Sequence, residues 1–440
     1  MSPVVERTDA VLTEHERFTQ GRGVSAPAWL RELRERGAGR FAALGFPTVR
    51  QEEWRFTNVA PIADTAFRLA EKTPTNAADL AARVRIPETA ARIVILNGRF
   101  APELSSLDKL PRGLVAGSLA NAIAHNRPEV AHLGQLPWEH APFIALNTAF
   151  LEDGAFVALA ANAVIDPPIH IISINGGAGK TMAHPRTLIV AGANSQARIA
   201  QTFLGAAGES HFANAVTEVS AGANATLDLY TDQREIDTAY HIAALQIQLQ
   251  RDATVRSRAV TLGGKLVRND IVGVLGGEGA HVALDGIYLV DGDRLVDNHT
   301  TIDHAVPNCT SHELYKGILD GKAKAVFNGR IIVREDAQKT DSKQTNRALL
   351  LSDHAVVNSN PQLEIFADDV KCTHGAAIGQ LDEEAMFYLR ARGLTERDAR
   401  YMLIHAYAGE VLERISVEPL RQQLERELFT QLDRDLADHR

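Results

Sequence analysis

The pattern of hydrophobic and polar positions changes character along the chain. Between about residues 156 and 379, short segments alternate apolar and polar residues, as in Ile169–Ile174 and Leu245–Gln250, and Gly, Asn and Asp residues separate these segments. Alternation with a period of two is typical of half-buried β-strands. The pattern therefore predicts that this long stretch is mainly β.

The turns between these segments recur. Thr187–Asn194 and Thr217–Asn224 match at Thr, Ala, Gly, Ala and Asn, 30 residues apart, and similar turns at Asp252–Ala253 and Gly279–Ala280 follow at comparable intervals. A period of this size indicates a solenoid, in which each coil buries its inner face by stacking on the next coil. We therefore expect a β-helix core over residues 156–379. A β-sandwich with similar hairpin turns is the alternative.

The flanking regions have helical patterns. We expect an N-terminal helical region over residues 1–90, a mixed linker region over 91–155 and a C-terminal helical domain over 380–440. In the last region apolar residues recur every three or four positions from Ala399 to Ile415, and a leucine stands at every fourth position from Leu420 to Leu436. These helices carry more apolar surface than they can bury by themselves. Either they cap the end of the solenoid or they form a groove for a partner.

Composition narrows the class of protein. The 440 residues are 45% hydrophobic and 23% charged, which is typical of a globular chain. The net charge of −9 argues against a protein that binds nucleic acid or an anionic membrane surface. The first residues lack the pattern of a signal peptide, and the apolar run from Phe156 to Ile165 is too short to span a membrane. We therefore expect a cytoplasmic protein.

The chain contains two cysteines, Cys309 and Cys372. Two cysteines cannot form a disulfide framework. They also cannot supply the four thiolates of an all-cysteine metal site. Any soft metal bound here would need other ligand types, or ligands from another chain.

One glycine-rich segment, Gly176–Thr181, ends in the Gly-Lys-Thr of a phosphate-binding loop. The full motif needs a glycine five positions before Gly179, but that residue is Ile174. A helix should also follow, whereas the sequence after Thr181 predicts a strand. We therefore interpret the segment as a glycine-rich turn, and we expect that this chain binds no nucleotide.

The best candidate for chemistry is the pair Cys372 and His374. Their spacing of two places both side chains on one face of an extended strand. A thiolate and an imidazole are half of a tetrahedral site for zinc or for a cluster iron. A packed thiol beside a hydrogen-bonded histidine is the structural alternative. A second group, His299, His304 and His312, lies in polar sequence and is expected to be structural.

No catalytic motif stands out. The chain has no Gly-x-Ser-x-Gly sequence, and the adjacent Asp368 and Asp369 would point to opposite faces of a strand. The sequence thus predicts a protein that is not an enzyme. A carbohydrate-active β-helix enzyme would need export and a carboxylate cluster, and neither is evident. A stand-alone metal-binding protein that uses Cys372, His374 and the second histidine group is the remaining alternative.

Several segments between about residues 327 and 394 resemble those of a known protein family. They are Asn328–Ile331, Ala337–Asp341, Gln344–Asn346, Leu349–Ser352, Pro361–Ile365, Ala367–Ala376, Gly379–Glu384 and Phe387–Gly393. Together they resemble the SufB/SufD family, whose members are subunits of the Suf scaffold for iron–sulfur cluster assembly. Upstream, Glu53–Thr57 and Asn97–Phe100 fit the family more loosely, so the resemblance spans most of the chain.

The resemblance implies a fold and partners. The fold would be a right-handed parallel β-helix flanked by N-terminal and C-terminal helical regions. The β-helix would pair with a SufB-like paralogue, and the C-terminal helices would dock SufC, an ABC-type ATPase that carries the nucleotide chemistry. A homodimer of the isolated chain is a further possibility.

The resemblance favours the SufD branch of the family. SufB carries a sulfur-accepting cysteine in the segment that matches Gln344–Ser352, and this chain has none there. SufB also has a glutamate near the segment that reads Cys372-Thr-His374 here. The resemblance implies that His374, with Cys372 as a weaker second, is a ligand of iron or of a nascent iron–sulfur cluster. That cluster would be transient and shared across the SufB interface. The chain departs from the expected pattern at Ala348 and Ala377.

Overall fold

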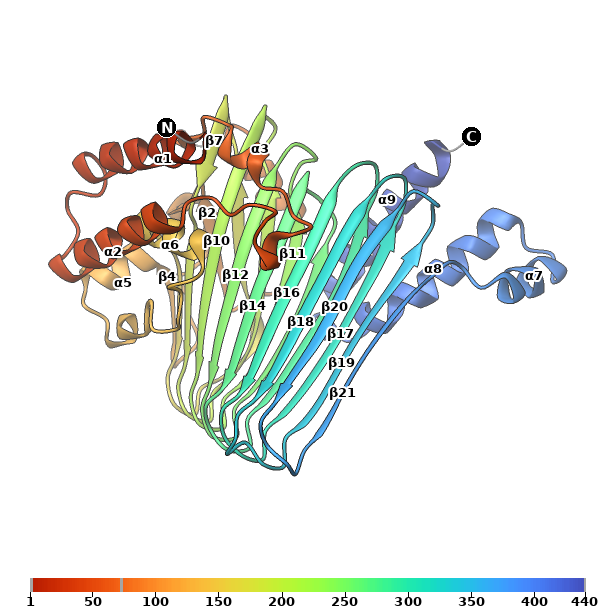
Figure 1. The fold of residues 1–440 in the computed structure, drawn as a ribbon. Helices are drawn as coiled ribbons and strands as arrows, with labels where there is room; N and C mark the ends of the chain where they lie inside the picture. Colours follow the sequence, from red (N-terminus) through yellow and green to blue (C-terminus); the bar gives the residue numbers. More distant parts are fainter. Residues whose placement is uncertain (1–2, 72–73, 439–440) are drawn as a thin grey trace.

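The chain folds into a β-solenoid built from two parallel sheets (Figure 1). The computed structural model describes residues 3–71 and 74–438. From β8 onward, strands that follow each other in sequence alternate between the two sheets, and each pairs in parallel with the strand one coil earlier. The predicted solenoid is confirmed, and the sandwich with hairpin turns is wrong because hairpins would produce antiparallel pairs.

Sheet A has eleven strands and sheet B has ten. The strands of sheet A are β1 (Arg68–Leu69), β4 (Leu114–Ser118), β5 (Gly154–Leu159), β7 (Lys180–Ala183), β8 (Arg186–Ala191), β10 (Ser210–Ala221), β12 (Tyr240–Leu249), β14 (Leu266–Leu275), β16 (Leu295–His304), β18 (Lys324–Val333) and β20 (Val356–Ile365). The strands of sheet B are β2 (Ala91–Leu96), β3 (Arg99–Phe100), β6 (Val164–Asn175), β9 (Gln196–Gly205), β11 (Thr226–Arg234), β13 (Thr254–Thr261), β15 (His281–Val290), β17 (Thr310–Leu319), β19 (Asp341–Leu350) and β21 (Lys371–Gly379).

The equivalent turns of successive coils explain the repeat seen in the sequence. In each coil, one residue of this turn has a left-handed backbone conformation, and these residues are 27 to 32 positions apart. They are Asn162, Asn194, Asn224, Asp252, Gly279, Asn308 and Lys339. The first three form a ladder, in which the side-chain amide of Asn224 donates to Asn194 (3.0 Å) and that of Asn194 donates to Asn162 (2.9 Å). Asn, Asp and Gly tolerate this conformation best, so the turn residues fix where each coil bends.

The interior of the solenoid is a continuous apolar core between the two sheets. Inward-facing side chains stack in columns, because each strand pairs in register with the strand of the next coil. Leu227, Val255 and Val282 form such a column in sheet B, and all three are fully buried. This stacking is how a coil that could not bury its inner face alone becomes stable.

Most of the N-terminal helices cover the outer face of sheet A, whereas two contact sheet B. The N-terminal helices are α1 (Pro3–Gln20), α2 (Ala28–Leu44), η1 (Glu52–Trp54), α3 (Ala60–Ala63), α4 (Ala77–Arg83), η2 (Pro102–Leu104), α5 (Leu119–Ala124), η3 (Pro128–His132) and α6 (Pro142–Ala149). Helices α4 and η2 are the two that contact sheet B, at β6 and β2. Apolar residues of the layer on sheet A, such as Phe41 and Phe143, join the outward-facing residues of that sheet in a second core. The guanidinium of Arg268 on β14 lies 3.7 Å from the ring centre of Trp54, which anchors η1 to the solenoid.

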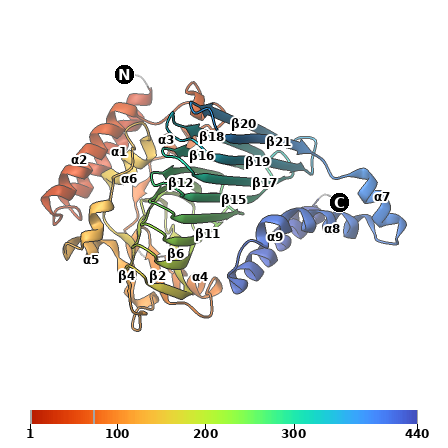
Figure 2. The same cartoon turned by 90° about the horizontal axis from the view of Figure 1, so that it is seen from below.

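The C-terminal helices α7 (Glu383–Ala391), α8 (Glu396–Leu412) and α9 (Glu418–Asp438) follow β21. Asp382 caps α7 as its side chain accepts from two backbone amides. Helices α8 and α9 lie along the outer face of sheet B rather than over the end of the solenoid (Figure 2). The leucines at 420, 424, 428 and 432 are buried against that face, and the side chain of Leu436 lies outside the described part. Of the two alternatives for these helices, the cap over the end of the solenoid is therefore wrong.

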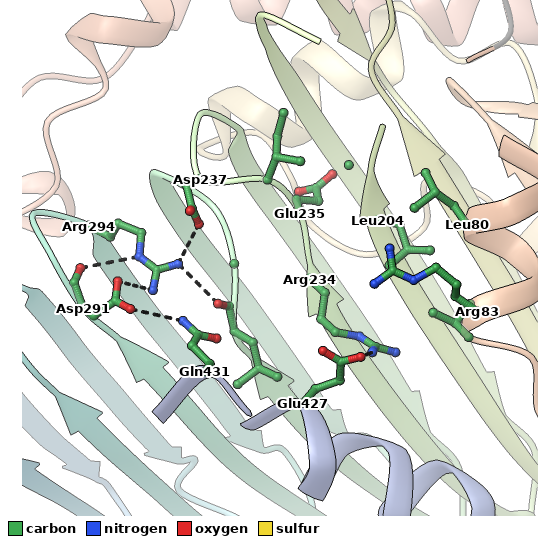
Figure 3. A pocket seen from close by; sticks show the side chains of 15 residues that line it. Leu80, Arg83, Leu204, Arg234, Glu235, Asp237, Asp291, Arg294, Glu427 and Gln431 are labelled. Atoms are coloured by element: carbon green, nitrogen blue, oxygen red, sulfur yellow. Dashed lines mark hydrogen bonds and ion pairs between the residues drawn. The ribbon is translucent and has the colours of Figure 1, made fainter. Parts of the chain in front are cut away.

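A junction of ion pairs holds α9 beside the turns of sheet B (Figure 3). It surrounds a cavity of about 510 Å³. Arg234 pairs with Glu427 of α9 at 3.2 Å, and Gln431 of α9 donates to Asp291 at 3.5 Å. Because the arginine and the aspartate belong to the solenoid, these contacts fix the position of α9. None of the helices in residues 3–71 and 74–438 is long and apolar enough to cross a membrane.

Candidate ligand site at the open end of the solenoid

Cys372 and His374 both lie on β21, the last strand of the solenoid. In register, Cys372 is opposite Ser342 and His374 is opposite Gln344 of β19. β21 forms the edge of sheet B and β20 forms the edge of sheet A, so each pairs with one neighbour only. The solenoid thus ends in two open strand edges, and both candidate residues are at this end (Figure 1).

The two residues continue columns of inward-facing side chains. The column of Cys372 runs back through Ser342 and Ser311 to Val282. The column of His374 is formed in the same way by Gln344, then Glu313, then Leu284. The columns are apolar at β15 and become polar from β17 onward. Cys372 is half-buried and His374 is exposed, because no further coil covers them.

The polar interior behind the two residues is linked by hydrogen bonds. His304 Nε2 shares a hydrogen bond with the Ser311 hydroxyl (2.9 Å), which in turn contacts the Ser342 hydroxyl (2.7 Å). In the second column, Gln344 Nε2 donates to the carboxyl group of Glu313. Burial raises the pKa of Glu313 to about 7, although hydrogen bonds from Gln344 and Thr300 oppose this shift.

Sequence reasoning missed this interior network. Its signal is present in the sequence, since Ser311 and Glu313 recur as Ser342 and Gln344 at a spacing of 31 residues. Polar residues at alternating positions were compatible with an outward-facing surface. Only the strand register shows that they face the core.

The surroundings of the two cysteines differ. Cys372 packs beside Ile331 and Val333, and burial together with the charge of Asp341 raises the pKa of its thiol. Cys309 is fully buried in the central core, and its thiol donates to the carbonyl of Gly277 at 3.4 Å. Cys372 is therefore the thiol that a ligand or a reagent could reach.

The second histidine group does not converge. His299 and His304 are on β16 and His312 is on β17, so they lie on strands rather than in turns. His299 is buried and would lose charge by desolvation, but Asp297 at 3.0 Å raises its pKa to about 9. His299 also contacts Glu53 of η1, at 3.2 Å. His299 and His304 are thus partnered to neighbouring side chains.

No group of three or more His, Cys, Asp or Glu side chains within the described residues could hold a metal ion. Cys372 and His374 supply two donors on one strand. A tetrahedral metal needs four donors. Cys372 and His374 therefore form at most half of a metal site, and they lie on the open edge strand β21.

Apolar side chains are exposed around the same end of the solenoid. Phe366, which follows β20, is 64% exposed, and Val356 and Ile378 on the two edge strands are each 45% exposed. An unpaired strand edge with apolar neighbours is a template for pairing with another strand.

In the glycine-rich segment Gly176–Thr181, the first four residues form the turn between β6 and β7, and Lys180 and Thr181 begin β7. A strand follows the turn, as the sequence predicts, and within the described residues no helix begins directly after it. The turn therefore lacks the geometry of the phosphate-binding loop that its last three residues resemble.

The comparisons with known proteins assign the chain to a family. Residues 172–407 match the family model described as SUF system FeS cluster assembly, SufBD core domain, and residues 17–171 match the SufBD protein N-terminal region. An iron–sulfur cluster assembly SufBD family protein of Synechocystis is 36% identical, over 89% of this chain and 88% of its own length.

Two further relatives cover the chain to a similar extent. The iron–sulfur cluster assembly protein SufD of Escherichia coli is 30% identical, over 86% of this chain and 88% of its own length. The SufD protein of Bacillus subtilis is 22% identical, over 90% of this chain and 93% of its own length. The two family models together span both the N-terminal layer and the solenoid. The chain therefore belongs to the SufBD family of the SUF iron–sulfur cluster assembly system.

Proposed function

We propose that this chain is a non-catalytic, SufD-type scaffold subunit that pairs with a SufB-like paralogue and contributes a ligand to a nascent iron–sulfur cluster. The observation that carries the proposal is the open end of the solenoid. There, two unpaired strand edges, exposed apolar side chains and the donors Cys372 and His374 occur together. The cluster, or its iron, is the cargo of the assembly and not a resident cofactor.

Pairing through β20 and β21 would continue both sheets into the partner. Each edge strand offers a row of backbone groups to a strand of the same direction or the opposite one. A paralogue with the same fold would present matching edges. Continuous sheets would also cover Phe366 and Ile378, which are now exposed.

The incomplete ligand set supports a shared site. His374 is exposed at the edge, where its imidazole could reach an iron held between two chains. Cys372 lies one inward-facing position before it and could add a thiolate. The partner would supply the remaining ligands of a tetrahedral iron.

The ATPase would dock elsewhere, on α7 and α8. Helix α7 has no buried residues, and it projects away from the solenoid (Figure 2). Phe387 and Tyr388 on α7 are 76% and 57% exposed, and Met402 on α8 is also exposed. Large exposed apolar side chains of this kind are typical of docking surfaces. A SufC-like ABC ATPase is the partner that the family relationship suggests.

The test compares two histidine variants in the complete complex of this chain with a SufB-like and a SufC-like subunit. His374→Ala removes the proposed ligand, and His354→Ala removes an exposed histidine in the turn before β20 as a matched control. Cluster formation under anaerobic conditions is followed by visible absorbance. We expect His374→Ala to lower the yield at least about tenfold and His354→Ala to change it less than about twofold.

Recovery of the complex is measured for both variants by size-exclusion chromatography. Equal cluster yields in the two intact complexes would overturn the ligand role of His374. A stoichiometric metal bound by the isolated chain, and lost in His374→Ala, would instead favour the stand-alone metal-binding alternative.

A further inference from the structure

We propose that a cavity in the N-terminal layer binds a small molecule that carries phosphate groups. The cavity, called the N-terminal cavity below, has a volume of about 760 Å³. Three segments form most of its wall: the end of α1, the strand β1 and the glycine-rich turn before β7. Arg99 of β3 adds to this wall. The proposal concerns binding at a place remote from the open end of the solenoid, and it does not depend on the proposed function.

Strand pairing builds the cavity. β1 pairs in parallel with β7, so Arg68 lies opposite Thr181. This pairing brings a segment before residue 72 next to the turn at residues 176–181. The volume is in the range of pockets that hold ligands of cofactor size, roughly 300–1,000 Å³.

The wall of the cavity is cationic in a protein that is acidic overall. Its charged side chains are Arg17, Arg22, Arg68, Arg99, Lys180, Glu14 and Glu71. Five cations thus face two carboxylates, while the whole chain has a net charge of −9. Such a local excess of positive charge is costly in the absence of an anion, and it attracts one.

The internal ion pairs leave part of this charge uncompensated. Arg17 and Arg68 share one carboxylate, that of Glu14, at 3.1 and 2.8 Å. Arg22 pairs with Glu152 at 3.6 Å. Arg99 donates to the backbone carbonyl of Glu71 at 3.0 Å, which is a neutral acceptor. Lys180 is exposed and has no ion-pair or hydrogen-bond partner for its ammonium group within residues 3–71 and 74–438.

The glycine-rich turn adds neutral donors. Gly176, Gly177 and Gly179 have positive φ values of 115°, 143° and 77°. In the described part of the chain, the amides of Gly177 and Gly179 are not hydrogen-bonded to any carbonyl or side chain outside the strand ladders. A turn with free amides makes a concave anion site.

The hydroxyl of Thr181, which follows Lys180, is a buried polar group without a hydrogen-bond partner in the described residues. Buried hydroxyl groups are nearly always hydrogen-bonded in native proteins, so an unsatisfied one at a cavity wall is a donor that a bound anion could use. The hydroxyl, the free amides and the guanidinium groups are the donors that bind phosphate oxygens.

The cavity beside α9 provides a contrast. There, Arg234 and Arg294 are paired with carboxylates, and the acidic side chains outnumber the basic ones (Figure 3). The charged side chains that line that cavity therefore carry no net positive charge. The excess of cations is therefore particular to the N-terminal cavity.

The experiment measures pyrophosphate binding to the purified full chain by isothermal titration calorimetry, with sulfate as the reference anion. Lys180→Ala removes the unpaired ammonium group. Lys322→Ala is the matched control, because Lys322 is also an exposed lysine that follows a left-handed glycine in a solenoid turn. We expect Lys180→Ala to weaken pyrophosphate binding by about tenfold or more, and Lys322→Ala by less than about twofold.

A second variant and a second probe sharpen the result. Arg99→Gln should also weaken pyrophosphate binding, which tests the site without relying on one lysine. ADP should bind at least as tightly as pyrophosphate if the cavity holds more than the phosphates. The proposal is overturned if neither pyrophosphate nor ADP binds more tightly than sulfate, or if the two lysine variants weaken binding equally.

Discussion

Glu313 is a carboxyl group in the interior of the solenoid, two register positions behind His374. It is fully buried, and its two neighbours in the column are Leu284 and Gln344. Burial favours the neutral form of a carboxylic acid, so the pKa is raised to about 7. A buried group that titrates near neutrality makes the stability of the last coils depend on pH.

The replacement Glu313→Gln should remove this dependence. The folded state holds the Glu313 proton up to a pKa of about 7, whereas the unfolded state releases it near 4.5. Stability is therefore lost as pH rises from about 4.5 to about 7, and the deficit above pH 7 is on the order of 3 kcal/mol. The free energy of unfolding, measured with denaturant at pH 5 and at pH 8, gives the size of this deficit. We expect Glu313→Gln to be the more stable protein at pH 8.

The matched control for that prediction is Glu335→Gln, an exposed glutamate in a nearby turn. It should leave the difference in stability between pH 5 and pH 8 unchanged. If Glu313→Gln shows the same pH dependence as the wild type, then Glu313 is not the titrating group.

The two thiols should react at very different rates in the native chain. Burial and Asp341 raise the pKa of Cys372, so only a small fraction is thiolate at neutral pH. We expect alkylation of one thiol per chain, with a rate that rises about tenfold per pH unit from pH 7 to pH 9. Mass spectrometry of peptides after timed quenching identifies the thiol.

Cys372→Ser should abolish this reaction and leave Cys309 unmodified until the chain unfolds. A rate that is already constant at pH 7 would contradict the raised pKa. In a complex with the paralogue, alkylation of Cys372 should slow, because the proposed partner covers β21.

At the scale of single residues, the sequence identified the two candidate ligands but not their setting. The spacing of two places Cys372 and His374 on one face of a strand. It does not say which face points into the core, because a shift of one residue in strand register would turn the same side chains to the opposite face. Ser342 and Gln344 therefore carried no signal until the pairing of β19 with β21 was known.

At the scale of elements, the turn repeat was readable because Asn194 and Asn224 occur in nearly identical turns. The equivalent positions Asn308 and Lys339 were missed, because their neighbours differ although their backbone conformations are the same. The amphipathic pattern of α8 and α9 correctly indicated a buried stripe. It could not show that the stripe packs on the side of sheet B, because a pattern within one element does not identify the surface that it meets.

Helix α9 should be a cooperative unit that depends on its leucine stripe. Leu428 is fully buried against sheet B. We expect Leu428→Ala to destabilise the docking of α8 and α9 by about 2–5 kcal/mol, through lost burial and the cavity left behind. Hydrogen exchange measured by mass spectrometry should then show faster exchange in α8 and α9 and unchanged exchange in β11 and β13.

Arg426→Ala is the control for Leu428→Ala, because Arg426 is an exposed residue on the opposite side of α9. It should leave exchange in both regions as in the wild type. If Leu428→Ala instead accelerates exchange in the solenoid strands to the same extent, the helices and the solenoid unfold as one unit.

At the scale of the whole molecule, the two proposed docking surfaces lie close together in the chain. The open end of the solenoid lies at β20 and β21, and the exposed helix α7 lies beyond it in the chain, joined through Gln380–Asp382. A truncation at Gly379 is a poor test of these surfaces. It would remove α8 and α9 and expose the apolar outer face of sheet B, including Leu314, Ile318 and Leu349. Point variants on each surface separate the two roles without this damage.

Two such variants should dissociate the two proposed partners independently. Phe366 and Phe387 are 64% and 76% exposed, so a charge at either position should not disturb the fold. Phe366→Asp places a charge at the open end of the solenoid, where it opposes burial under a paralogue. Phe387→Asp does the same on α7, where the ATPase is proposed to dock. The chain is used as bait for both partners, and each recovered partner is quantified.

We expect Phe366→Asp to lower recovery of the paralogue about tenfold or more and to preserve the ATPase, with the reverse pattern for Phe387→Asp. The independence of the two losses is the informative result, because the two phenylalanines lie on separate elements with no shared core. Each variant serves as the folding control of the other, since a misfolded chain would lose both partners. Loss of both partners from two chains with wild-type melting temperatures would mean that the surfaces are coupled, and that the solenoid end and α7 act as one interface.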